Sequence, residues 1–188
     1  MNHLEQLIIE KHKIKEQVIT ELKKESFLGS NPCSKDKEYM NCVYDILAHE
    51  KCKKMSNFIQ HGSTTTLDHC IKVSYVSYKI CKKFGYNYRA AARGGLLHDM
   101  FLYDWHTYKK ETGNRLHGLT HPKVAHRNAS RYFKLTDMEA DIILKHMWPL
   151  TIVPPKYIEG YVVMYADKYC TVFETIHRLK ERVLPSAL

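Results

Sequence analysis

An adjacent histidine and aspartate, His98 and Asp99, are the residues of this chain whose types most clearly suggest chemistry. They follow a segment of mostly small and apolar residues, 90–97. Burying an ionised carboxylate beside an imidazole is unfavourable unless a partner offsets the lost hydration. A divalent cation is a suitable partner, because imidazole and carboxylate groups are both good metal ligands. The dipeptide is common by chance, so the prediction of a metal site depends on the residues around it. The small residues before it would let neighbouring helices approach closely.

Four more residues of the same two types occupy positions from which they could join this site. His69 and His146 lie on the apolar faces of two predicted helices, so both side chains should point inward. Asp167 follows a segment that is apolar on every side, where an unpaired carboxylate would be unfavourable. His121 stands at the predicted start of another helix. The predicted ligand set comes from five segments and comprises His69, His98, Asp99, His121, His146 and Asp167.

The chemistry of this set narrows the choice of metal. Four imidazoles and two carboxylates suit Fe, Mn, Co, Ni or Zn better than Ca or Mg. One tetrahedral ion would not need all of them. Two ions with Asp99 as a bridge would use the whole set, so we predict a divalent transition metal present as two ions.

Apolar residues that recur at helical spacing predict an all-α fold, a single-domain helical bundle, because no segment alternates convincingly over strand length. Pro122 suits the first turn of its helix, and Thr136 with Glu139 has the form of a capping box. Residues 1–60 are expected to form N-terminal helices packing on the core, and 61–188 the metal-binding domain. The predicted helices span 3–26, 36–59, 67–84, 88–102, 122–133, 136–147 and 156–182, with an irregular segment at 104–120.

Composition limits the compartment and the partners. The 188 residues suffice for one domain with a real core. No apolar run approaches the ~20 residues of a membrane span, and the N-terminal residues lack the apolar part of a signal peptide. The six cysteines form no CxxC pair, so buried reduced thiols are expected. These features predict a cytoplasmic protein without a membrane partner.

The net charge of +9 is unevenly distributed, since residues 61–188 carry nineteen Lys and Arg against eleven Asp and Glu. A small anionic substrate such as a phosphate ester fits this excess. A Lys-rich solvated surface explains it equally well. No basic run is interleaved with stacking aromatic residues, so nucleic acid is not the expected partner.

The order and spacing of the six ligands resemble the HD-domain superfamily of metal-dependent phosphohydrolases. The resemblance covers roughly residues 64–175 and implies an all-helical core that holds its metal through these residues. Members with the two additional histidines commonly bind two ions, and this chain is similar to that type. The segments that carry the resemblance are Asp68–Val73, Leu96–Asp99, His121–Ala125 and Tyr165–Lys168.

The sequence departs from one branch of the superfamily. Met147 occupies the position at which enzymes specific for cyclic dinucleotides carry a second consecutive histidine. The chain also lacks the Gly-Tyr-Pro motif of those enzymes. A cyclic-di-GMP phosphodiesterase is therefore not expected.

The resemblance implies hydrolysis of a phosphoester or phosphoanhydride in a small, nucleotide-like anion by a metal-activated water. Asp99 would be the catalytic residue. Lys72 lies one turn after His69 on roughly the same helix face and could contact a phosphate oxygen. Each further candidate for substrate binding could equally be a solvated surface residue; they are Arg115, His117, Lys123, His126 and Lys168.

Two other functions are compatible with the same ligands. HD-fold enzymes with six ligands include mixed-valent di-iron oxygenases, which cleave C–C or C–P bonds with O₂. A metal-stabilised regulatory module without catalysis is the third possibility. The metal content and a test for turnover would distinguish these three.

Overall fold

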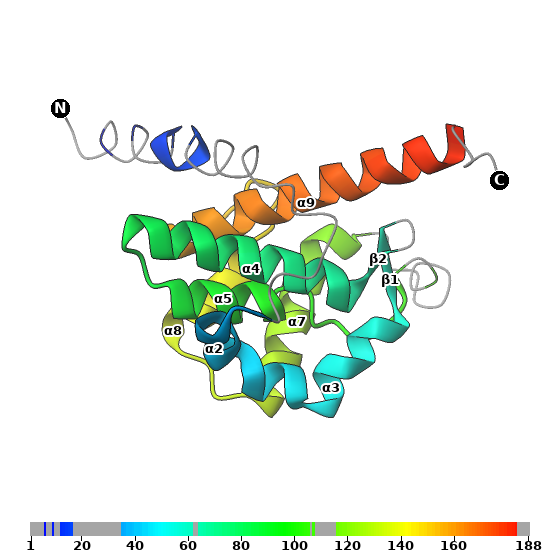
Figure 1. Ribbon diagram of the computed structural model, residues 1–188, viewed down its shortest axis with the longest axis horizontal. Coiled ribbons are helices and arrows are strands. Elements are labelled where there is room, and N and C mark those ends of the chain that lie inside the picture. The colour runs from blue at the N-terminus through cyan, green and yellow to red at the C-terminus, as the bar shows by residue number, and fades with distance from the viewer. Residues whose placement is uncertain are drawn as a thin grey trace.

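The protein is described by a computed structural model covering residues 6, 9, 12–16, 35–61, 64–105, 107 and 116–183, without the side chains of 61, 117, 177, 178 and 180–183. Helices dominate the described chain, which confirms the all-α fold (Figure 1). The elements are α2 (Lys37–Ala48), α3 (Glu50–Lys53), the 3₁₀ helix η2 (Lys54–Asn57), β1 (Ile59–His61), β2 (Thr64–Thr65), α4 (Thr66–Phe84), α5 (Tyr88–Leu97), α7 (His117–Tyr132), α8 (Asp137–Lys145) and α9 (Ile158–Val183).

Local capping fixes where several of these helices begin and end. The Thr65 side chain accepts a hydrogen bond from the Asp68 backbone N–H at the start of α4, and Gly85 ends that helix with a φ of 74°. Such a left-handed conformation carries no steric penalty for glycine. The capping box of α8 is confirmed, because the side chains of Thr136 and Glu139 each accept from the other's backbone N–H.

The structure differs from the sequence prediction at three helix boundaries. The predicted helix 36–59 is interrupted at His49, whose backbone is extended and whose Nδ1 accepts from the Lys51 N–H. Helix α5 ends at Leu97, earlier than predicted. Helix α7 begins before Pro122 and includes it, although a proline nitrogen cannot donate the helical hydrogen bond at that position. Most of the predicted helix 3–26 lies outside the described residues, although 12–16 are helical.

A short antiparallel hairpin, β1 with β2, was not predicted. It is too short to show a period-two pattern, since β2 has two residues. The hairpin leads directly into α4, so a residue of β1 lies beside the first turn of that helix.

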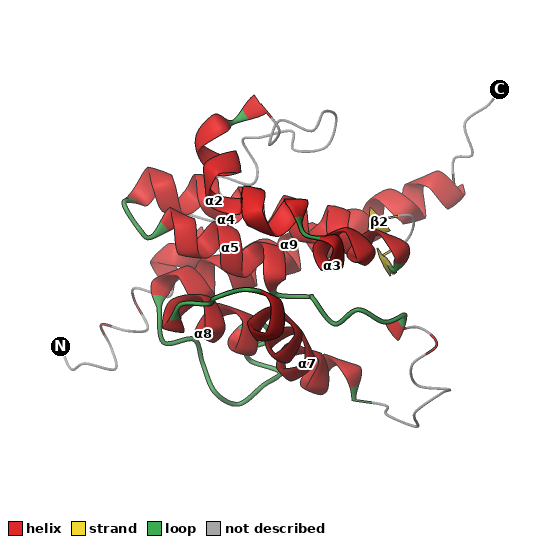
Figure 2. Cartoon of the chain, turned by 90° about the horizontal axis from the view of Figure 1, so that it is seen from below, coloured by secondary structure: helices red, strands yellow, loops and turns green. Residues whose placement is uncertain are grey.

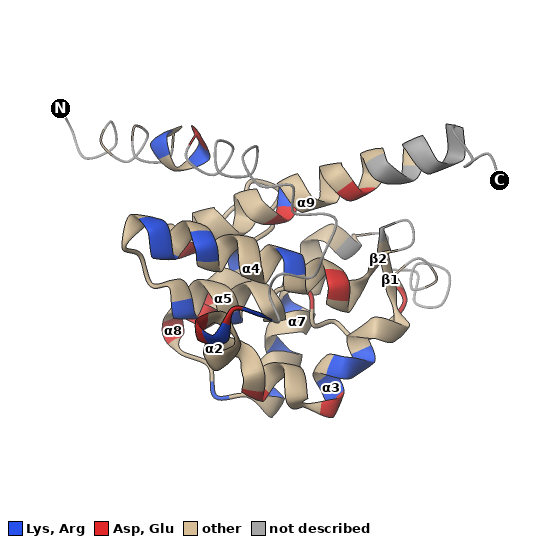
Figure 3. Cartoon of the chain, viewed as in Figure 1, with Lys and Arg blue, Asp and Glu red and all other residues tan. Residues whose placement is uncertain are grey.

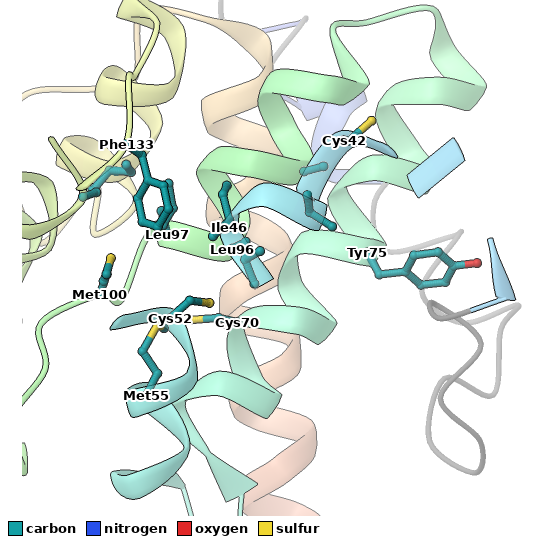
Figure 4. Packing of buried hydrophobic residues seen from close by; sticks show 14 of the residues in the cluster. Cys42, Ile46, Cys52, Met55, Cys70, Tyr75, Leu96, Leu97, Met100 and Phe133 are labelled. Carbon is teal, nitrogen blue, oxygen red and sulfur yellow. The ribbon is translucent and has the colours of Figure 1, made fainter. Parts of the chain in front are cut away.

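Helices α4 and α5 pack against each other at the centre of the molecule, and α9 packs against both of them. Figure 2 shows α2 on one side of α5 and α8 on the other. One apolar cluster joins mainly α2, α4, α5 and α7 (Figure 4). A second joins α4, α5, α8 and α9 and includes Ile14 from the N-terminal segment. The division of the chain near residue 60 stays a prediction.

Two adjacent glycines permit the close packing around α5. A Cβ atom on Gly95 would lie 3.0 Å from the Ser74 Cα of α4, and one on Gly94 would lie 2.7 Å from Ile142 Cγ2 of α8. Larger side chains would therefore push these helices apart. The expectation that small residues before His98 allow close helix approach is confirmed.

Two further expectations concern the cysteines and the membrane. The described cysteines are free and buried: Cys42, Cys52, Cys70, Cys81 and Cys170. Cys33 lies outside the described residues. Within the described part of the chain, no helix combines the length and apolar character that crossing a membrane requires.

Candidate metal centre

The structure brings the six predicted ligands together at the point where the central helices meet. His69 lies on α4 and Asp167 on α9, while His98 and Asp99 directly follow α5. His121 lies on α7, and His146 caps the end of α8. All six residues are buried, with exposed fractions between 0% and 8%.

The first group of ligand atoms comes from His69, His98, Asp99 and Asp167. His69 Nε2 lies 3.1 Å from Asp167 Oδ1, and His98 Nε2 lies 3.6 Å from the same oxygen and 3.4 Å from Asp99 Oδ2. His69, His98 and Asp99 each present a ligand atom within 4.8 Å of the others. These atoms could hold one ion.

The second group consists of Asp99, His121 and His146, which also fall within 4.8 Å of one another. Asp99 Oδ1 lies 3.1 Å from His121 Nε2 and 3.5 Å from His146 Nε2. The two imidazole nitrogens are 2.8 Å apart. Asp99 thus directs Oδ2 toward the first group and Oδ1 toward the second, as a bridging carboxylate would.

Three of the histidines are oriented by hydrogen bonds to the other ring nitrogen. His98 Nδ1 donates to the Gly95 carbonyl at 2.7 Å, and His146 Nδ1 donates to the Ile143 carbonyl at 2.9 Å. His69 Nδ1 lies 3.0 Å from Glu174 Oε2. With Nδ1 as the donor, each neutral ring presents the unprotonated Nε2 to the centre, which is the form that binds metal.

Two atoms of the centre bear on whether a metal ion fits there. His98 Nε2 and Asp99 Oδ1 are buried side-chain atoms without a hydrogen-bond partner in the described structure. Leaving buried polar atoms unsatisfied costs about 1–3 kcal/mol each. Both atoms face other ligands rather than an apolar wall, so a bound cation would satisfy them. The residues therefore fit divalent metal.

The charges of the centre are strongly coupled. Burial by itself lowers the pKa of His69, but hydrogen bonds to Asp167 and Glu174 outweigh it and raise that pKa to about 10. Burial would raise the carboxyl pKa of Asp99 and Asp167, yet the neighbouring imidazoles hold both below the ordinary range. Burial lowers the pKa of His146. Both carboxylates are therefore ionised and His146 is neutral at pH 7.

Two supporting residues were not predicted from the sequence. Glu174 accepts from His69 through Oε2 and from Lys72 through Oε1, each at 3.0 Å. Gln60 of β1 donates from Nε2 to Asp99 Oδ2 at 2.6 Å. Glu174 follows Asp167 by seven residues on α9, so its position on the same helix face was a usable signal. Gln60 had no comparable signal.

The candidate substrate-binding residues have different surroundings. Lys72 is paired with Glu174, and its side chain is one-third exposed, at 34%. The Lys168 ammonium donates to the Trp148 carbonyl at 2.9 Å. On α7, Lys123 is exposed and His126 is half-buried, 3.4 Å from Ser130 Oγ. Arg115 and the side chain of His117 lie outside the described residues.

Comparison with known families agrees with this architecture. Residues 66–171, more than half of the chain, match the HD domain. The chain therefore belongs to the HD-domain superfamily, a superfamily of metal-dependent hydrolases. No curated protein and no solved structure matches the chain.

Proposed function

We propose that this protein is a binuclear metal-dependent phosphohydrolase that cleaves a phosphoester or phosphoanhydride bond in a small, nucleotide-like anion. The observation that carries the proposal is the position of the Asp99 carboxylate, whose two oxygens face two different groups of buried imidazoles. Two divalent ions held by these groups, Fe, Mn, Co, Ni or Zn, would supply Lewis acidity and a water of lowered pKa.

Hydrogen bonds to neighbouring residues hold three imidazole rings in the orientation that metal binding requires. The backbone carbonyls of Gly95 and Ile143 hold His98 and His146 with Nε2 directed inward. Glu174 does the same for His69. Because these partners fix the rings before any ligand binds, little reorganisation is needed when the site is used.

The charge balance favours an anionic substrate only when cations occupy the centre. With the imidazoles neutral, as metal binding requires, the immediate surroundings contain three carboxylates, Asp99, Asp167 and Glu174, against the ammonium of Lys72. Two divalent ions would reverse this negative balance. In the view of Figure 3, basic residues are spread over several helices beside acidic ones. The local charge of the loaded centre, rather than one basic surface patch, would then attract a phosphate.

We extend the proposal to the substrate contacts and the compartment. Lys72 can offer its remaining N–H donors to a phosphate oxygen while it stays paired with Glu174. Arg115, His117, Lys123, His126 and Lys168 remain proposed contacts because they are near the ligands in the sequence. The free buried cysteines support a reducing compartment, the cytoplasm.

The proposal is tested by metal analysis of the purified protein together with a phosphatase screen over nucleotides and sugar phosphates. The expected result is about two ions per chain and phosphate release that depends on Mn²⁺, Co²⁺ or Ni²⁺. If no phosphate compound is hydrolysed and an iron-loaded sample consumes O₂ with a polyol or a phosphonate, the protein is instead an oxygenase. Full metal occupancy without any turnover would indicate a regulatory module.

The role of Lys72 has its own test. A hydrogen bond from a charged group contributes about 1.5–3 kcal/mol, so Lys72→Ala should raise KM or lower kcat/KM by about ten- to a hundredfold. Metal content should stay at the wild-type value, because Lys72 is not a ligand. Lys123→Ala tests the exposed lysine on α7 in the same assay. A loss of bound metal in Lys72→Ala would mean that this lysine acts through Glu174 and His69 rather than on the substrate.

A further inference from the structure

A residue outside the matched family region reaches into the metal centre. Gln60 lies on β1, before residue 66, where the HD-domain match begins. Its exposed fraction is 8%, and its Nε2 lies 2.6 Å from Asp99 Oδ2. The β1–β2 hairpin turns the chain back so that this side chain enters the site beside the first turn of α4. Gln60 therefore connects the hairpin directly to the Asp99 carboxylate.

The orientation of the Gln60 amide follows from its second partner, Thr66. The Thr66 hydroxyl lies 3.2 Å from both Gln60 Oε1 and the Phe58 carbonyl. The Phe58 carbonyl also accepts from the Thr66 backbone N–H at 2.8 Å, so donation of the single hydroxyl proton to Gln60 Oε1 leaves neither oxygen without a donor. With Oε1 on the Thr66 side, the amide NH₂ faces Asp99 and donates to its Oδ2. A reversed amide would place its oxygen against an ionised carboxylate, which cannot donate.

The hydrogen bond from Gln60 restrains rotation of the Asp99 carboxylate about its Cβ–Cγ bond. It holds Oδ2 on the side of His98, which leaves Oδ1 facing His121 and His146. Without the amide, rotation about the Cβ–Cγ bond could turn both oxygens toward one group of imidazoles. A carboxylate in that orientation would bind one ion with two oxygens instead of joining two ions.

We propose that Gln60 is a positioning residue that fixes Asp99 in its bridging orientation, with Thr66 setting the direction of the Gln60 amide. This inference rests on the proposed binuclear centre. Partners that orient a metal ligand typically contribute about ten- to a hundredfold in metal affinity or activity. The hairpin is therefore part of the metal centre, although the HD-domain match excludes it.

The test uses the full-length protein loaded with Mn²⁺, because two manganese ions joined by a carboxylate give an exchange-coupled EPR spectrum. Gln60→Met keeps the length and packing of the side chain but removes both hydrogen bonds. We expect it to weaken Mn²⁺ binding about ten- to a hundredfold in competition with a chelator and to lose the coupled spectrum. Ile59→Val, on the same strand but exposed, should leave both measurements at the wild-type values.

A second pair of variants serves if Gln60→Met does not fold. Thr66→Val preserves side-chain shape and leaves Gln60 in place, but it removes the hydroxyl and should weaken Mn²⁺ binding. Thr66→Ser keeps a hydroxyl and should bind Mn²⁺ with wild-type affinity. Wild-type affinity and an unchanged EPR spectrum in Gln60→Met, or in Thr66→Val, would overturn the inference. A single Mn²⁺ per wild-type chain would also overturn it, because there would be no bridge. A wild-type protein with two coupled ions but no phosphatase activity would refute the proposed function and leave the role of Gln60 intact.

Discussion

At the scale of single residues, the imidazoles around Asp99 differ in which of its two carboxylate oxygens they face. Oδ1 is shared with His121 and His146, and Oδ2 faces His98. His121 belongs to the second group alone. If the centre is binuclear as proposed, the number of ions lost on substitution distinguishes these residues.

We expect His121→Ala to retain about one ion per chain and Asp99→Asn to retain fewer, because Asp99 contributes to both groups. The measurement is metal content by mass spectrometry after loading with excess Mn²⁺ and desalting. His146→Ala is the matched variant and should behave like His121→Ala. Two ions in His121→Ala would refute a binuclear site of this composition.

The pKa shifts of the centre predict that metal binding releases protons. Burial lowers the pKa of His69 and His98, but their carboxylate neighbours outweigh it and raise both above the ordinary value. Both rings are then protonated at pH 7 in the metal-free protein. Because the pKa of His69 is higher in the folded than in the unfolded protein, protonation of this ring stabilises the metal-free fold. The stabilisation is complete below the unfolded-state pKa of about 6.5 and is lost as the pH rises through the folded-state pKa of about 10.

Because metal must displace these protons, Mn²⁺ affinity should increase from pH 6 to pH 8, with release of about one to two protons at pH 7. Calorimetry in two buffers of different ionisation enthalpy measures that number directly. His69→Gln should release fewer protons than the wild type. Heats that are the same in both buffers would show that the histidines are already neutral.

At the scale of helices and strands, the site depends on how closely α5 approaches its neighbours. A Cβ on Gly95 would lie 3.0 Å from the backbone of Ser74. The Gly95 carbonyl also accepts from His98 Nδ1. Crowding at Gly95 should therefore affect both the stability of the helix pair and the direction of a metal ligand.

Gly95→Ala should destabilise the metal-free protein by about 1–3 kcal/mol, as overpacked cores do, and should also weaken Mn²⁺ binding. Gly118→Ala is the matched control, since its Cβ would also lie 3.0 Å from a neighbour, here the flexible end of the exposed Leu150 side chain. That control should be neutral or slightly stabilising, because alanine favours a helix more than glycine does. Urea denaturation compares the two variants, and equal losses of stability would contradict the packing argument.

The helices themselves were largely predictable, because their periodicity and caps are local. The capping box of Thr136 and Glu139 defined the start of α8. The predicted helix boundaries were wrong where one residue type is compatible with two positions relative to a helix. Pro122 can begin a helix or lie within its second turn, and α7 takes the latter. The His49 side chain interrupts the predicted second helix by capping the short helix after it.

At the scale of the whole molecule, one buried arginine joins the N-terminal helices to the core. Arg93 of α5 donates to Glu139 of α8 at 2.8 Å, and to the Cys42 carbonyl and Asp45 of α2 at 2.9 and 2.6 Å. The Arg93 and Glu139 side chains are 8% and 3% exposed, whereas Asp45 is 59% exposed. The two ion pairs of this arginine should therefore differ in their effect on stability.

Removing one partner of a buried ion pair typically costs about 3–5 kcal/mol, so we expect Glu139→Ala to lower the free energy of unfolding by that amount. Asp45→Ala should lower it by less than about 1 kcal/mol, because exposed pairs are screened by solvent. Chemical denaturation of the metal-free proteins measures both. Similar losses would mean that Arg93 depends equally on its two carboxylates.

The sequence by itself predicted the six residues that the structure brings together at one buried site. Their types favour metal ligation, and helical periodicity directs several of them inward, so this prediction needed no knowledge of distant contacts. For the same reason the all-α fold followed from the sequence.

Only the tertiary structure decided how the six residues are divided into two groups and which side chains support them. The contact of Gln60 with Asp99 spans 39 residues, and that of His69 with Glu174 spans 105. Local periodicity reports which face of a helix a residue occupies, but not which residue of another segment meets it. The orientation of the Asp99 carboxylate depends on such long-range contacts, because the packing of four helices and one short hairpin sets the direction of each partner around it.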